Sequence, residues 1–465
     1  MASTKADIKL GETVVSEVEI LRSDDLVFDP KSRPSIELAI KMILGSYGGY
    51  RVPFAAVPLA HHEGIAEQNL FRCLFGRDSL LISDLLQKHH PEIQESVVLA
   101  LASVQGSQFD ILSEEEPGRI PHEVRALNDP RAVELMESGQ WKFPYYGAVD
   151  ATLIWLSTLA RIASSKPDFL DQEVLGLFLW QRAISATKWL LKRLQTPSRL
   201  IESNRSNPRG IQNQVWKDSE DSYMHSDGTL AIGNSTASIE TVAEAFDALQ
   251  AVAQIMKQRP SSDWPGTVSD MLGTAEVLRA NLIELMWLGD RFALGTERDI
   301  FGTQRAFDSQ ASNQGRLLDS GILVGDQFLV YREAIAKALT SPGLLGESGL
   351  RTLSKDHPSY RPGGYHTGTA WPMDGIFSCR GLVRHGFDSQ AQMIHQRVKG
   401  AIESFGGYPE FFRGDFPDHG LISRSVIDVI RKQPSGKEIL SRIVQPPQIM
   451  QGWTIGAYAW LSDDS

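Results

Sequence analysis

Three carboxylates lie within four residues of one another directly after Trp216: Asp218, Glu220 and Asp221, with Lys217 beside them. Like charges this close raise one another's pKa, whereas a neighbouring ammonium group lowers it. A carboxylic acid that stays protonated near neutral pH can donate a proton to a glycosidic oxygen. The segment therefore predicts a general acid among its carboxylates. The competing interpretation is a solvent-facing or helix-capping loop, which Asp and Ser also favour.

A second acidic residue, Glu410, lies far away in the sequence between Pro409 and Phe411, with Arg413 close behind. A carboxylate held among apolar groups near a guanidinium group can serve as a general base, because its surroundings shift its pKa. The alternative is that Glu410 and Arg413 form an ion pair that holds the loop together. The sequence leaves both interpretations open.

Arg77 and Asp78 form an adjacent cation and anion in the segment 75–79. A guanidinium group offers donors and a carboxylate offers acceptors, so together they match two neighbouring hydroxyl groups of a sugar. We therefore predict that both residues bind substrate. The simpler interpretation is that Asp78 or Ser79 caps the helix that follows.

The segment 363–374 carries Tyr365, His366 and Trp371 directly before a predicted helix, whose first turn Pro372 fits. Rings at this place suit the wall of a sugar-binding subsite, because aromatic faces stack on sugar rings. A plain helix start explains the same residues.

Helical periodicity dominates the chain after a polar lead-in of residues 1–30, which contains one candidate strand at residues 13–21. The periodicity predicts about eleven to thirteen helices in a single catalytic domain that spans residues 31–465. The clearest candidates are residues 35–44, 79–87, 93–104, 149–163, 172–194, 238–256, 268–287, 327–339, 371–384, 389–404 and 449–461.

Four long segments separate these helices, and all are rich in Gly, Pro, Asp and aromatic residues: 106–146, 196–234, 339–370 and 405–448. Loops longer than about 15 residues in a compact domain tend to be functional. We hypothesise helical hairpins arranged in a ring, with the long loops gathered at one end around a pocket. The number of helices alone fits a bundle or a solenoid equally well.

The composition favours a small neutral oligosaccharide or glucoside over a polyanion as the ligand. The chain has a formal net charge of −11 and no basic run, which removes an electrostatic case for nucleic acid binding. No stretch approaches the roughly 20 apolar residues that span a bilayer. Residues 1–19 lack the apolar core of a signal peptide. We therefore expect a cytoplasmic protein without a membrane partner, and the sequence carries no signal for its oligomeric state.

Metal and disulfide chemistry find little support in the sequence. Cys73 and Cys379 are too few for a disulfide framework and lack the Cys/His spacing of a zinc site. His61 and His62, followed by Glu63, invite a metal interpretation, but adjacent side chains on a strand or helix point apart. We predict no metal and no cofactor.

Seven motifs, taken in order, resemble the amylo-α-1,6-glucosidase family, which comprises the glucosidase domain of glycogen-debranching enzymes and its bacterial relatives. The resemblance runs from about Ser35 to the C-terminus. The matching strings are Phe75-Gly76-Arg77-Asp78-Ser79, Glu116-Pro117-Gly118 with His122-Glu123-Val124-Arg125, Tyr145-Tyr146-Gly147 with Asp150-Ala151-Thr152, Trp216-Lys217-Asp218-Ser219, His366-Thr367-Gly368-Thr369-Ala370-Trp371-Pro372, Pro409-Glu410, and Pro447-Gln448 with Gly452-Trp453.

The resemblance implies an all-α (α/α)6 toroid and an inverting, exo-acting α-glucosidase that releases a terminal glucosyl residue, α-1,6-linked or from a related oligosaccharide. It assigns the general acid to Asp218 and the general base to Glu410, with Asp221 as the alternative acid. Inversion needs roughly 6.5–9.5 Å between the two carboxyl groups, which leaves room for a water molecule. Substrate binding is expected from Arg77, Asp78, Tyr146, Trp216, Lys217, Tyr365, His366, Trp371 and Trp453.

The sequence departs from the family in two places. Bacterial relatives usually carry an N-terminal β-rich domain where this chain has only the polar lead-in. The family's Pro-Gln-Ala-Trp near the end is replaced by Pro447-Gln448-Ile449-Met450-Gln451-Gly452-Trp453. The natural glycoside therefore stays open. The rivals are a trehalase-like or glucosylglycerate-type α-glycosidase, a phosphorylase of the same fold, and a carbohydrate-binding relative without activity.

Overall fold

The computed structural model describes residues 9–10, 13–14, 33–57, 71–231, 235–299, 301–415, 425–432, 438–445 and 447–463. Within the expected lead-in it contains β1 (Lys9–Leu10) and β2 (Thr13–Val14), which pair antiparallel. The rest of the strand expected at 13–21, and the segment 61–63 weighed for a metal, lie outside the described residues. The boundary between a lead-in of residues 1–30 and one catalytic domain stays a prediction.

Helices make up most of the regular structure, as the periodicity predicts. Within the described ranges they are α1 (Ile36–Ile43), α2 (Gly76–Leu85), α3 (Pro91–Ser103), α4 (Pro130–Glu137), α5 (Asp150–Ser165), α6 (Leu179–Arg193), α7 (Ile239–Gln258), α8 (Val268–Met286), α9 (Gly315–Asp319), α10 (Leu329–Leu339), α11 (Pro372–Arg384), α12 (Asp388–Glu403) and α13 (Gly452–Asp463).

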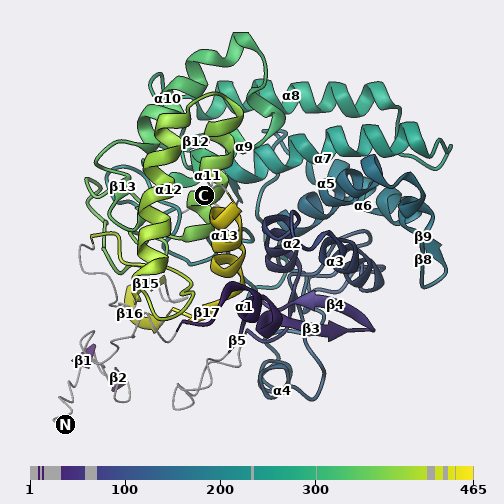
Figure 1. The fold of residues 1–465 in the computed structure, drawn as a ribbon, viewed down its shortest axis with the longest axis horizontal. Helices are drawn as coiled ribbons and strands as arrows, with labels where there is room; N and C mark the ends of the chain where they lie inside the picture. The colour runs from purple at the N-terminus through teal and green to yellow at the C-terminus, as the bar shows by residue number, and fades with distance from the viewer. Residues whose placement is uncertain are drawn as a thin grey trace.

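Six of these helices contact one another in a closed circuit: α2 packs on α5, α5 on α7, α7 on α9, α9 on α11, α11 on α13, and α13 returns to α2. Each has a second helix against it, in the pairs α2–α3, α5–α6, α7–α8, α9–α10, α11–α12 and α13–α1. Figure 1 shows α7 and α8 extending side by side, and α12 beside α11. The chain therefore alternates between inner helices and the helices that cover them.

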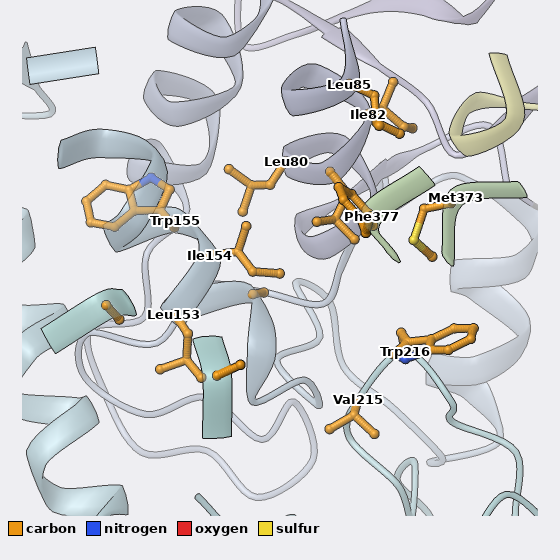
Figure 2. Close-up of a cluster of buried hydrophobic side chains, with 14 of the residues drawn as sticks. Leu80, Ile82, Leu85, Leu153, Ile154, Trp155, Val215, Trp216, Met373 and Phe377 are labelled. Carbon is orange, nitrogen blue, oxygen red and sulfur yellow. The ribbon is translucent and has the colours of Figure 1, made fainter. Parts of the chain in front are cut away.

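The burial of α7 and α8 distinguishes the two roles. The sequence suggests one apolar face for residues 238–256, but α7 is buried on nearly all sides, because α5, α6, α8 and α9 surround it. In α8 the buried residues follow one stripe: Met271, Ala275, Leu278, Leu282 and Met286. Ser238 and Thr267 cap the two helices through their side chains. Figure 2 shows the core around α2, α5 and α11, with Leu80, Trp155 and Phe377 buried in it.

Short strands accompany the helices, so the all-α prediction was incomplete. They are β3 (Leu44–Tyr47), β4 (Tyr50–Pro53), β5 (Ala56–Val57), β6 (Leu74–Phe75), β7 (Glu123–Val124), β8 (Glu173–Val174), β9 (Leu177–Phe178), β10 (Ser235–Ser238), β11 (Gly295–Arg298), β12 (Gln304–Phe307), β13 (Leu345–Gly346), β14 (Gly349–Leu350), β15 (Ser425–Lys432), β16 (Glu438–Gln445) and β17 (Met450–Gln451). The order β10-β11-β12 forms a three-stranded sheet, and the other strands pair in twos.

The helix predicted over residues 172–194 begins only at Leu179. Before it, β8 and β9 form a hairpin whose turn residues Leu175 and Gly176 have positive φ angles of 50° and 78°. A helix cannot continue through such residues. The apolar positions Val174 and Leu177, which suggested a helical stripe, belong to this hairpin.

The long segments contain more structure than loops. Helix α4 lies within residues 106–146, and the antiparallel pair β15–β16 lies within residues 405–448. Helix α9 was also absent from the predicted set, because five residues are too few to show a period. Across the described part of the chain, no helix combines the length and the apolar character needed to cross a membrane.

Candidate active site

One cavity of about 300 Å³ collects side chains from all four long segments and from the first turns of inner helices. Eight of the predicted residues line it: Arg77, Asp78, Trp216, Asp218, Tyr365, Trp371, Glu410 and Trp453. These residues are far apart in the sequence, and the ring of inner helices brings them together. The expectation that the long loops meet around one pocket is therefore confirmed.

Arg77 and Asp78 occupy the first turn of α2, directly after β6, which pairs with β7. Gly76 allows this close approach, since a Cβ there would clash with the Pro121 carbonyl oxygen. Arg77 Nη1 donates to Asp150 Oδ2 at 3.1 Å, at the start of α5. Burial raises the pKa of Asp78 to about 7; Arg77 opposes this rise and the charge of Asp218 adds to it.

Asp218 lies on the loop between α6 and β10. Its side chain is half-buried and lines the cavity. This burial raises its pKa to about 6, while the charge of Arg77 lowers it and that of Asp150 raises it. A carboxyl group with this pKa is still partly protonated near neutral pH, as a general acid requires.

Glu410 lies on the segment between α12 and β15, and its carboxyl group is held at both oxygens. The Tyr365 hydroxyl donates to Oε1 at 2.7 Å, and the backbone N–H of Gln448 donates to Oε2 at 3.1 Å. Burial raises the pKa of Glu410 to about 7, although these two hydrogen bonds lower it. The charges of Asp78 and Asp218 raise it further. The alternative pairing with Arg413 does not form, because Arg413 binds Asp415 instead at 2.9 Å.

Aromatic rings form a continuous wall beside these carboxyl groups. Trp371 packs edge-on against Trp216 with centroids 5.7 Å apart, and against Tyr365 at 5.1 Å. Trp453 lies 5.8 Å from Trp371. Such a wall supplies the apolar faces on which a sugar ring packs.

Four predicted residues lie outside this lining. Asp221 is buried and accepts a hydrogen bond from Ser219 Oγ at 2.9 Å. The Tyr146 hydroxyl donates to the Val104 carbonyl oxygen at 2.8 Å. Lys217 and His366 are also turned away from the cavity. The structure therefore brings Asp218, rather than Asp221, to the cavity with Glu410.

His366 contacts the loop that carries Asp218. Its Nδ1 lies 2.8 Å from Ser219 Oγ and 3.2 Å from Ser222 Oγ, and its ring stacks near Trp371. Burial lowers its pKa well below the usual value, so the ring is neutral at pH 7. The side chain is a structural contact of the loop.

Residues that were not predicted from the sequence as site residues also line the cavity. His122, Glu123 and Arg125 come from around β7, and Trp141 comes from the segment after α4. Trp141 stacks on Tyr145 with centroids 4.2 Å apart. The residues around β7 stood in one of the family motifs, but no single feature marked them as cavity residues.

Several polar atoms at the cavity lack a hydrogen-bond partner among the described residues. They are Arg77 Nε, Asp78 Oδ2, His122 Nδ1 and Trp453 Nε1. A buried polar atom without a partner costs roughly 1–3 kcal/mol. Arg77 Nε and Asp78 Oδ2 form an ion pair at 3.7 Å, which is too long for a hydrogen bond. A ligand with several hydroxyl groups could supply the missing hydrogen bonds.

A larger hollow, about 1090 Å³, opens at the opposite ends of the inner helices. Its charged groups are largely paired with one another. Arg380 joins Asp84 at 2.5 Å and Asp319 at 3.0 Å, and Arg161 also binds Asp84. Since the predicted motifs converge on the smaller cavity, that cavity is the candidate site.

No arrangement of three or more His, Cys, Asp or Glu side chains that could hold a metal occurs within the described ranges. Cys73 and Cys379 are both buried, and no disulfide bond joins them.

Comparison with solved structures reveals a shared fold. The chain is similar to GH63 mannosylglycerate hydrolase from Thermus thermophilus in complex with Tris, with 11% identity, a TM-score of 0.57, and coverage of 92% of this chain and 100% of the other. The same hydrolase in complex with Tris and D-glycerate has 12% identity and a TM-score of 0.58, and the match covers 93% of this chain and 100% of the other. An uncharacterized conserved protein from the same organism gives 12%, 0.54, 93% and 99%.

No family model and no curated protein matches the sequence. The resemblance of the motifs to the amylo-α-1,6-glucosidase family is therefore not confirmed by these comparisons. What the similarity at 11–12% identity establishes is the helix-rich fold of the mannosylglycerate hydrolase.

Proposed function

We propose that this chain is an inverting glycoside hydrolase built as an (α/α)6 toroid. The closed circuit of six inner helices, each with one covering helix, supports the toroid. The shared fold with a glycoside hydrolase supports the same architecture. The observation that carries the enzymatic proposal is that two carboxyl groups from distant segments, Asp218 and Glu410, line one small cavity, where burial raises the pKa of both.

In the proposed mechanism, protonated Asp218 donates to the leaving oxygen of the glycoside. Ionised Glu410 takes a proton from a water molecule, which attacks the anomeric carbon from the opposite face. Arg77 and Asp78 bind hydroxyl groups of the sugar, and the wall of Trp216 and Trp371 packs against its ring. The reaction draws only on carboxyl groups and water, so it requires no metal or cofactor.

For the substrate, we propose a terminal α-linked glucosyl residue of a short oligosaccharide, α-1,6-linked or related. The ordered motifs support this choice, since most of their charged and aromatic residues line the cavity. The presence of a base such as Glu410 argues against a phosphorylase, in which phosphate replaces the attacking water.

A second candidate is a hexosylglycerate. The structural neighbours named as mannosylglycerate hydrolase favour it. So do Arg125 and Arg131, which line the cavity and offer guanidinium groups to a carboxylate. Arg125 is already paired with Glu123, and Arg131 binds Glu134 at 2.7 Å, which weakens this candidate.

A substrate panel tests the proposal: maltose, isomaltose, panose, trehalose, glucosylglycerate and mannosylglycerate, with released sugar measured in phosphate-free buffer. We expect turnover of at least one α-glucoside by the wild-type protein, and its loss in Glu410→Gln. Turnover that requires phosphate would identify a phosphorylase. Binding of these sugars without any hydrolysis would identify an inactive relative and refute the proposal.

A further inference from the structure

Lys217 stands between two residues that line the cavity, yet its own side chain turns away from it. Trp216 and Asp218 line the cavity, whereas Lys217 is 0% exposed and its Nζ donates to the Thr352 carbonyl oxygen at 2.6 Å. Burying an ammonium group is costly, and a neutral side chain of similar volume is often tolerated better. The presence of a cation here therefore calls for a specific role.

The charge of Lys217 does not account for the pKa of the acid. Burial raises the pKa of Asp218, and the charges that act on it most are those of Arg77 and Asp150. Burial lowers the pKa of Lys217 to about 8, and the carboxylates that oppose this are Asp374 and Glu240. The geometry of the loop is therefore the main route by which Lys217 can influence Asp218.

The residue whose carbonyl group Lys217 contacts is connected to Glu410 by hydrogen bonds that alternate with covalent links within Thr352, Thr369 and Tyr365. The backbone N–H of Thr352 donates to the Thr369 carbonyl oxygen at 2.8 Å. Thr369 Oγ1 donates to the Tyr365 carbonyl oxygen, and the Tyr365 hydroxyl donates to Glu410 Oε1 at 2.7 Å. One network thus connects the loop of the acid with the carboxyl group of the base.

We propose that Lys217 is a positioning residue that sets the separation between the Asp218 and Glu410 carboxyl groups. Its ammonium group binds the Thr352 carbonyl oxygen and so holds the loop that carries Asp218 against the segment that carries Thr352 and Tyr365. The catalytic consequence rests on the proposed function, in which this separation must leave room for a water molecule. Misplacing a reacting group by about 1 Å can cost roughly a hundredfold in rate.

The test variant is Lys217→Met, which keeps the length of the side chain and removes the ammonium group. We expect crystal structures of wild type and variant to show the Asp218 carboxyl group displaced by about 1 Å or more relative to Glu410. We expect kcat to fall roughly tenfold to a hundredfold for an alkyl glucoside, and much less for 4-nitrophenyl glucoside, because a good leaving group needs little help from the acid.

The pH profile of kcat/KM shows whether Lys217 acts on the position of Asp218 or on its pKa. Because Lys217 does not set the pKa of Asp218, the limbs of the kcat/KM profile of Lys217→Met should stay at the wild-type pH. Lys142→Met is the matched control: it removes a lysine that pairs with Asp110 on the surface at 2.6 Å. This control should change neither the carboxyl separation nor the ratio of the two substrates.

Unchanged carboxyl positions together with an unchanged substrate ratio in Lys217→Met would overturn the proposal. If Lys217→Met does not fold, Lys217→Gln replaces it, since it also removes the ammonium group that donates to the Thr352 carbonyl oxygen. It must then produce the same displacement, or the proposal fails. If the wild type hydrolyses no glycoside, the proposed function fails, while the crystallographic comparison still decides the role of Lys217.

Discussion

Replacing Tyr365 with phenylalanine isolates the hydrogen bond that keeps Glu410 ionised. The tyrosine hydroxyl donates to Oε1 at 2.7 Å, and this hydrogen bond partly offsets the effect of burial, so that the pKa of Glu410 rises to about 7 and no further. A hydrogen bond to a charged group contributes roughly 1.5–3 kcal/mol. At about 1.4 kcal/mol per pKa unit, its loss should raise the pKa of Glu410 by about one to two units.

The assay is kcat/KM as a function of pH. The base acts only when ionised, so at low pH the rate is proportional to the small ionised fraction of Glu410. A higher pKa makes that fraction smaller, and we expect Tyr365→Phe to lose roughly tenfold to a hundredfold at pH 5. At the alkaline end both proteins hold Glu410 ionised, and the two curves should converge. Because Asp78, Asp218 and Glu410 interact, the limbs report the group as a whole.

Tyr408→Phe is the control, since the Tyr408 hydroxyl donates to the Pro34 carbonyl oxygen at 2.9 Å and touches no cavity carboxylate. It should leave the shape of the profile unchanged. A loss of rate by the same factor at every pH in Tyr365→Phe would contradict this role, because the hydroxyl would then have no effect on the ionisation of Glu410.

Three further predictions concern the acids and the start of α2. The folded-state pKa of Asp78, about 7, lies above its usual value of 3.8. The folded protein therefore loses stability as the pH rises from about 3.8 to about 7, because Asp78 ionises at a cost in the folded state. Asp78→Asn should raise the melting temperature at pH 8 and leave it nearly unchanged at pH 4. Asp218→Asn should abolish most turnover of an alkyl glucoside, whereas Asp221→Asn should retain it provided that it folds. Gly76→Ala should destabilise the protein by about 1–3 kcal/mol in urea unfolding, because its Cβ would clash with the Pro121 carbonyl oxygen.

The sequence is a good guide to helices whose ends carry local signals. Pro372 marks the first turn of α11, and Ser238 caps α7, as their positions before apolar periodic runs indicate. It fails where tertiary contacts outweigh the period. Apolar residues of the β8–β9 hairpin are spaced as they would be on a helix, so the periodicity predicts a helix there. Gly176, which has a positive φ angle, indicates a turn instead.

The sequence was enough to select the carboxylates of the candidate site, but not to predict which way the neighbouring side chains point. Asp218 and Glu410 could be selected because acid and base chemistry demands their type and the motifs fix their order. Side-chain direction could not be read from the sequence: Lys217 and Tyr146 stand within motifs, yet both reach backbone carbonyls outside the cavity. The wall containing Trp141 could not be predicted without the fold: β6 pairs with β7, Glu123 of β7 bridges to Tyr145, and Trp141 stacks on Tyr145.

The anomer of glucose that is released first distinguishes inversion from retention. Hydrolysis of an α-glucoside by the wild-type protein is followed by proton NMR from the first seconds, before mutarotation mixes the anomers. Inversion by Asp218 and Glu410 predicts that β-glucose appears first and α-glucose grows in later. Initial release of α-glucose would show retention and contradict the assignment of Glu410 as a base acting through water.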